Sequence, residues 1–191
     1  MIRRMHMRLA AVLMAALLSS TVASAQTMEF ACPDPGTTFI FDTGMKTVAL
    51  SRDGMTCNMD IAGGTPFKMH ALLIANPSPE GVDTSAFITA LRPERLWPLQ
   101  VGKKVEARYS AGGTSWNYIL TVARYEKRTG PRDALIDTFL VEMNEQGDKG
   151  QRSISRWWIS PADKYAIRYD YSDGSGRANR AVVTSVTRTS P

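Results

Sequence analysis

Residues 104–126 read KVEARYSAGGTSWNYILTVARYE and carry the strongest local signal of the chain. Apolar Val105, Ala107 and Tyr109 alternate with charged residues, and this period of two gives a strand one buried face and one face in water. The two glycines at 112–113 are a turn signal, and a second alternating run follows them. The stretch therefore predicts two antiparallel strands joined by a tight turn.

Runs of the same kind occur on both sides of this hairpin, separated by turns such as Asp53-Gly54. A short helix is predicted before Pro93, because Phe87 and Leu91 fall on one helical face. The predicted strands are 38–42, 46–52, 55–61, 66–75, 104–110, 116–126, 138–143, 152–160, 165–171 and 178–187. The predicted fold is all-β, mainly antiparallel, with about ten strands and one short helix, as a curved sheet, a sandwich or a partly closed barrel.

Residues 1–25 have the layout of a secretory signal peptide. Three arginines precede an apolar run from Leu9 to Leu18, and Ala23-Ser24-Ala25 is an A-x-A cleavage site. The apolar run is about ten residues long, shorter than the ~20 residues of a membrane-spanning helix, so we expect no membrane span. Residues 26–191 are predicted to form a single β-rich domain with a periplasmic or secreted location.

Residues 26–191 contain 20 Lys and Arg against 18 Asp and Glu, a net charge of +2. The two signs are interspersed along most of the chain, whereas a sequence-independent nucleic-acid binder needs a concentrated cationic face. Nucleic acid is therefore not expected as a partner.

The two cysteines, Cys32 and Cys57, both lie after the predicted cleavage site. Export places them in an oxidising compartment, where paired thiols form disulfides, so we predict a bridge between them. A redox pair or two metal ligands are the alternatives. Both are disfavoured, because the chain has no C-x-x-C spacing and His70 is the single histidine of residues 26–191.

No pattern in the sequence predicts catalytic residues, a cofactor or a metal site. His70 is the one available imidazole base, and its place in FKMHALLI is typical of a core or rim histidine. Carboxylates that could meet a hard cation in turns do not form a D-x-[DN]-x-[DN]-G loop. These carboxylates are Asp133, Asp137, Asp170 and Asp173.

The aromatic residues near position 158 are the candidate ligand-binding group. Trp157 and Trp158 are adjacent on a predicted strand, so their side chains point to opposite faces of the sheet. If the second face is open, one tryptophan lines a groove for a lipid, glycan or peptide, together with Arg156, Arg168 and Tyr169. The alternative is that the helix or the linker before it covers both faces of the strand.

Residues 97–171 also carry a set of dispersed motifs. They are PL-x-x-GK at Pro98-Leu99 and Gly102-Lys103, the strand residue Trp116, V-x-x-x-E at Val122 and Glu126, Asp137-Thr138-Phe139, and R-x-W-x-x-P at Arg156, Trp158 and Pro161. This set resembles a broad family of uncharacterised bacterial exported β-domains. The resemblance implies a curved antiparallel sheet, and it supplies no activity and no catalytic residues.

Together these observations predict an exported, periplasmic, non-catalytic binding or interaction module of a bacterial cell envelope. Its expected partner is an envelope lipid, glycan or protein. The protein is expected to be a monomer or a homodimer, since edge strands of an open sheet invite pairing. The alternative function is a small secreted hydrolase that uses carboxylate chemistry, with Asp137 as a candidate and His70 as a less favoured one.

Overall fold

The computed structural model describes residues 26–62, 64, 66–78 and 81–189, so the predicted signal peptide lies outside the described residues. The helices are α1 (Ser85–Leu91) and the 3-10 helices η1 (Pro93–Leu96) and η2 (Pro131–Asp133). The strands are β1 (Thr27–Met28), β2 (Thr38–Phe41), β3 (Lys46–Asp53), β4 (Thr56–Ile61), β5 (Pro66–His70), β6 (Ile74–Asn76), β7 (Leu99–Gln100), β8 (Lys104–Ala111), β9 (Thr114–Thr129), β10 (Leu135–Gly147), β11 (Arg152–Ser160), β12 (Tyr165–Asp173) and β13 (Ala178–Thr187).

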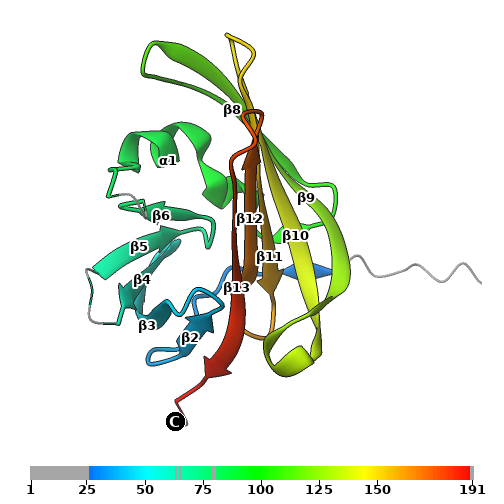
Figure 1. Cartoon of the computed structure of the whole chain (residues 1–191). Coiled ribbons are helices and arrows are strands. Elements are labelled where there is room, and N and C mark those ends of the chain that lie inside the picture. Colours follow the sequence, from blue (N-terminus) through cyan, green and yellow to red (C-terminus); the bar gives the residue numbers. More distant parts are fainter. Residues whose placement is uncertain (1–25, 63, 65, 79–80, 190–191) are drawn as a thin grey trace, which may run out of the picture.

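The main sheet consists of two antiparallel meanders joined edge to edge (Figure 1). Strands β2 to β6 form the first meander and β8 to β13 the second, and β2 pairs with β13 to give one eleven-stranded sheet. The end strands of this order, β6 and β8, are not neighbours, so the sheet is open. A separate two-stranded sheet pairs β1 with β7. The predicted all-β, mainly antiparallel class is confirmed, in the form of a curved sheet.

The strand predicted over 66–75 is wrong in one respect, because it is two strands. β5 ends at His70 and β6 begins at Ile74, and Ala71 and Leu72 between them have φ of 51° and 60°. This left-handed conformation is uncommon for residues other than glycine, and the apolar letters of this segment give no turn signal. Both side chains are buried, and the Trp97 Nε1–H donates a hydrogen bond to the Ala71 carbonyl over 3.1 Å.

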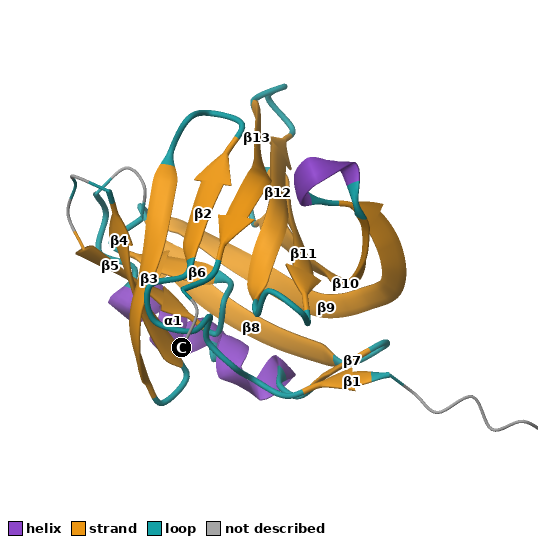
Figure 2. Ribbon diagram, turned by 90° about the horizontal axis from the view of Figure 1, so that it is seen from below, coloured by secondary structure: helices purple, strands orange, loops and turns teal. Residues whose placement is uncertain are grey.

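The β9–β10 hairpin is longer than its sequence pattern predicts. β10 spans 13 residues, more than twice the predicted 138–143, and a bulge lies between Leu140 and Val141. Beyond the bulge the hairpin curls, and η2 at its far end contacts β13 (Figure 2). Gly130 permits this curl, because a Cβ there would lie 2.5 Å from the Ile136 Cδ1 atom. The curl therefore brings the end of β9 over one face of the second meander.

The two faces of β8 to β13 have different surroundings. The face that carries Tyr118 and Trp157 belongs to the core, where the Tyr118 ring lies 4.9 Å from Phe87 of α1. We call this the inner face and the opposite face, which carries Trp158, the outer face. α1 is the predicted short helix, and no helix among the described residues has the length and apolarity to cross a bilayer.

The predicted Cys32–Cys57 disulfide is present, with an S–S distance of 2.00 Å. Cys57 lies in β4 and is fully buried, and Cys32 precedes β2. The bridge therefore ties the segment before the first meander to its third strand.

We expect reduction, or the Cys32→Ser/Cys57→Ser double variant, to lower the free energy of unfolding by about 3 kcal/mol, because the unfolded chain regains the entropy of a 25-residue loop. Urea unfolding of the oxidised and variant proteins measures the difference. A loss of less than about 1 kcal/mol would contradict a stabilising role for the bridge.

Candidate functional site

The two adjacent tryptophans lie on opposite faces of β11. The Trp157 ring packs in the core at 5.4 Å from the Tyr169 ring, whereas Trp158 lies on the outer face. Both are buried, with 6% and 3% of their surface exposed. The structure therefore divides the five sequence candidates: Arg156, Trp158 and Arg168 share the outer face, and Trp157 and Tyr169 belong to the inner face.

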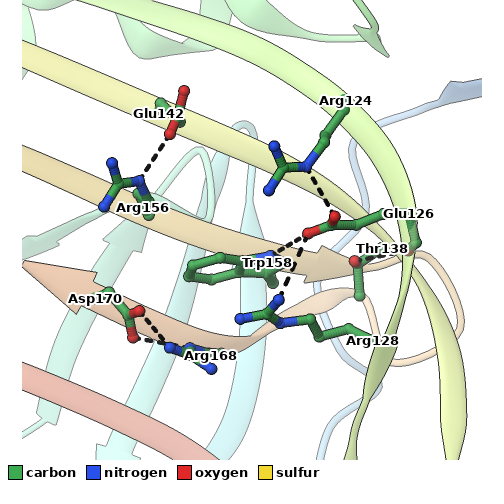
Figure 3. Close-up of polar contacts among 9 residues, drawn as sticks. All are labelled: Arg124, Glu126, Arg128, Thr138, Glu142, Arg156, Trp158, Arg168 and Asp170. Atoms are coloured by element: carbon green, nitrogen blue, oxygen red, sulfur yellow. Dashed lines mark hydrogen bonds and ion pairs between the residues drawn. The ribbon is translucent and has the colours of Figure 1, made fainter.

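Two arginines lie against the Trp158 ring. The Arg128 guanidinium lies 4.5 Å from the Trp158 ring centroid, and the Arg168 guanidinium lies 4.8 Å from it. The indole Nε1–H donates a hydrogen bond of 2.7 Å to Glu126 Oε1 (Figure 3). Both arginine side chains are partly buried, with 30% and 23% of their surface exposed, and burial strengthens a cation–π contact. Trp158 is thus the centre of a polar cluster on the outer face.

The cover over Trp158 comes from neither the helix nor the linker. Arg128 and Glu126 belong to the curled end of β9, and Arg168 is the register partner of Trp158 on β12. The contribution of β9 was not predicted from the sequence. A signal for it exists, because Arg124, Glu126 and Arg128 alternate with a period of two and therefore share a face.

Carboxylates accompany every arginine of the cluster. Three close pairs join Arg124 Nε to Glu126 at 2.8 Å, Arg156 Nε to Glu142 at 2.7 Å, and Arg168 Nε to Asp170 at 2.9 Å. Arg128 lies 4.0 Å from Glu126. We call these seven charged residues with Trp158 the arginine–tryptophan cluster. It contains four guanidinium groups and three carboxylates, so it has one positive charge in excess.

Glu126 links the parts of the cluster. Burial would raise the pKa of its carboxyl, but the hydrogen bonds from Trp158 and Arg124 and the charges of Arg124 and Arg128 outweigh it, so the pKa lies below 4.5. The Thr138 hydroxyl also donates to the Glu126 backbone carbonyl over 3.0 Å. Glu126 is therefore ionised at neutral pH and keeps the Trp158 indole and two arginines in place.

The catalytic candidates of the sequence analysis, His70 and Asp137, lie outside the arginine–tryptophan cluster and apart from each other. His70 lies between the Thr56 hydroxyl, 3.1 Å from Nδ1, and the Glu94 carboxylate, 3.4 Å from Nε2, which joins β4, β5 and η1. Asp137 pairs with Lys127 at 3.0 Å. Within the described part of the chain, no group of three or more His, Cys, Asp or Glu residues is arranged to hold a metal ion.

We expect Trp158→Phe to destabilise the protein more than Trp157→Phe, by about 1–2 kcal/mol. Both variants remove the same ring atoms from a buried site, but only Trp158 also loses a hydrogen bond to a carboxylate. Urea unfolding of the two variants tests this. Equal losses would show that the Glu126 contact contributes no net stability.

The lowered pKa of Glu126 predicts a pH dependence. A carboxyl whose pKa is depressed in the folded state stabilises the fold above its unfolded pKa, and this contribution is lost as pH falls from about 5 through the folded pKa. Glu126→Gln should therefore flatten the decline of stability between about pH 5 and pH 3. Glu106→Gln, an exposed residue of the same face, is the control, and identical slopes for both variants would contradict the role of Glu126.

No family model and no curated protein matches this chain. One similar solved structure is the crystal structure of the hypothetical lipoprotein YmcC from Escherichia coli K12. It has a TM-score of 0.44 and 10% sequence identity, and the alignment covers 81% of this chain and 84% of that chain. A likeness of this degree establishes neither a common family nor a common function.

Proposed function

We propose that this protein is an exported, periplasmic, non-catalytic binding module of a bacterial cell envelope, and that it binds an anionic envelope molecule at the arginine–tryptophan cluster. The observation that carries this proposal is the way the arginines are held. Arg124 and Arg156 each use Nε to bind a carboxylate, and neither makes a further hydrogen bond among the described residues. Their terminal N–H groups therefore remain available as donors.

The solvent exposure of the arginine side chains also indicates which of them can contact a ligand. The side chains of Arg124 and Arg156 are 58% and 37% exposed, so a ligand can reach them. Arg168 uses both Nε and Nη2 on Asp170 and lies against Trp158, so it acts as a positioning residue. A guanidinium that is already fixed loses little entropy on binding, and its fork of donors matches a carboxylate or phosphate.

Two observations support an extracytoplasmic location. Residues 1–25 have the layout of a signal peptide, and the Cys32–Cys57 bridge is of a kind that persists in oxidising compartments. Expression of the full chain in a Gram-negative bacterium, followed by fractionation and intact-mass measurement, tests the location. We expect a periplasmic product that begins at Gln26, and a cytoplasmic product of full mass would contradict export.

Binding is tested with Trp158 as the reporter. The lipid fraction and the soluble polysaccharide fraction of a bacterial envelope are titrated separately into residues 26–191, while the indole Nε1–H signals are followed by NMR. We expect one fraction to shift the Trp158 signal, and the Arg124→Gln/Arg156→Gln variant to reduce its response at least tenfold. If neither fraction moves the signal, or the variant responds equally, the proposal fails.

A second candidate function, a small secreted hydrolase, rests on Glu145. Burial raises the pKa of this carboxyl, although the hydrogen bond with Ser153 acts in the opposite direction. A general acid requires a raised pKa of this kind. Asp137 is less suited to this role, because its carboxylate is paired with Lys127 at 3.0 Å. The binding-module proposal predicts no turnover of chromogenic ester and glycoside substrates. Turnover that Glu145→Gln abolishes at unchanged thermal stability would favour the hydrolase instead.

A further inference from the structure

The charges of the second meander are sorted by face. In an antiparallel sheet, residues that are paired across strands share a face, so the register identifies every outer-face residue of β8 to β13. One row across the six strands is Lys104, Thr121, Glu142, Arg156, Asp170 and Arg180. Arg108 and Arg152 lie in the row nearer the hairpin tips, with Asn117 and Gln146 between them.

This face has a net positive charge larger than that of the whole domain. Its cations are Lys104, Arg108, Arg124, Arg128, Arg152, Arg156, Arg168 and Arg180, and its carboxylates are Glu106, Glu126, Glu142 and Asp170. Eight cations against four carboxylates leave +4. Since residues 26–191 together carry +2, the remainder of the domain is negative by two charges. The protein is therefore electrically polarised, with the outer face positive.

Three arginines on this face lack a carboxylate partner. Arg108, Arg152 and Arg180 are exposed, and the described residues give none of them an ion pair. They belong to β8, β11 and β13, the first and last of which are five strand spacings apart, about 24 Å at ~4.8 Å per spacing. Free positive charge is thus spread over the full width of the meander.

A shallow depression lies on the same face beside Arg152. It has a volume of about 490 Å³. Its lining includes the amides of Asn117, Asn144 and Gln146, the half-buried Ile119 and Ile154, and the carboxyl groups of Glu145 and Asp173. The amides and the Arg152 guanidinium supply hydrogen-bond donors to a polar group, while Glu145 and Asp173 offset the charge of Arg152, so the attraction for an anionic surface comes from the exposed arginines of the whole face.

We propose that the outer face of β8 to β13 docks on an anionic phospholipid surface, with Arg108, Arg152 and Arg180 as the principal contacts. This inference rests on the proposed function: it specifies the partner and extends the contact from the arginine–tryptophan cluster to the other arginines of the same face. Charge complementarity supports it, because cations distributed over about 24 Å match a surface that bears many separate negative charges. Trp158 is covered and no large apolar side chain of these rows is exposed, so attachment is electrostatic and without insertion.

The test uses residues 26–191 with the disulfide intact and co-sedimentation with vesicles. We expect binding to phosphatidylglycerol/phosphatidylcholine vesicles, no binding to pure phosphatidylcholine, and loss of binding when NaCl rises from 50 to 500 mM. Arg108→Gln/Arg152→Gln/Arg180→Gln should weaken binding at least tenfold. The matched control is Lys46→Gln/Lys68→Gln/Arg95→Gln, which removes the same charge from exposed residues elsewhere and should weaken binding less than threefold.

Each failure has a distinct meaning. Equal weakening by both triple variants would overturn the assignment to this face, because net charge alone would then account for binding. Binding to soluble polygalacturonate without binding to the anionic vesicles would overturn the lipid and assign the face to an anionic glycan, which leaves the proposed function standing. Failure of the proposed function is seen separately, when no envelope fraction moves the Trp158 indole signal.

Discussion

The pairing of β2 with β13 is the constraint on which the rest of the molecule depends. Four residues of β2, from Thr38 to Phe41, join the two meanders into one sheet. Asp42 extends the joint, because its backbone N–H donates to the Val182 carbonyl over 2.8 Å while its side chain accepts from the Val182 N–H over 3.0 Å. The Phe39 ring stacks on Tyr165 of β12 at 4.2 Å, so apolar packing supports these hydrogen bonds. Without this joint each meander would leave an apolar face in water.

Local pattern predicted most of the strands, because alternation and turn residues act over a few positions. The sequence could not predict the order of strands across the joint, which depends on contacts between residues about 145 positions apart. It also missed the break after His70. There, tertiary packing of Ala71 and Leu72 holds the chain in a conformation that their own propensities disfavour.

The sequence likewise predicted the local features of the candidate site but not its long-range contacts. Alternation alone placed Trp157 and Trp158 on opposite faces, and it also puts Arg156 on the face of Trp158. It could not show that β9 curls over that face, because the curl depends on the bulge after Leu140 and on the close approach at Gly130. Net charge was misleading for a related reason. A balance of +2 over residues 26–191 conceals a fold that collects the excess cations on one side of a sheet.

The disulfide has a consequence for the order in which the protein is completed. Both of its cysteines belong to the first third of the chain, whereas β13, the partner of β2, is the last strand. Synthesis proceeds from the N-terminus, so Cys32 and Cys57 become available long before residues 183–187. The covalent bond then keeps the first meander compact while the edge of β2 still lacks its partner. A bridge formed in that interval would limit pairing of this open edge with a wrong strand.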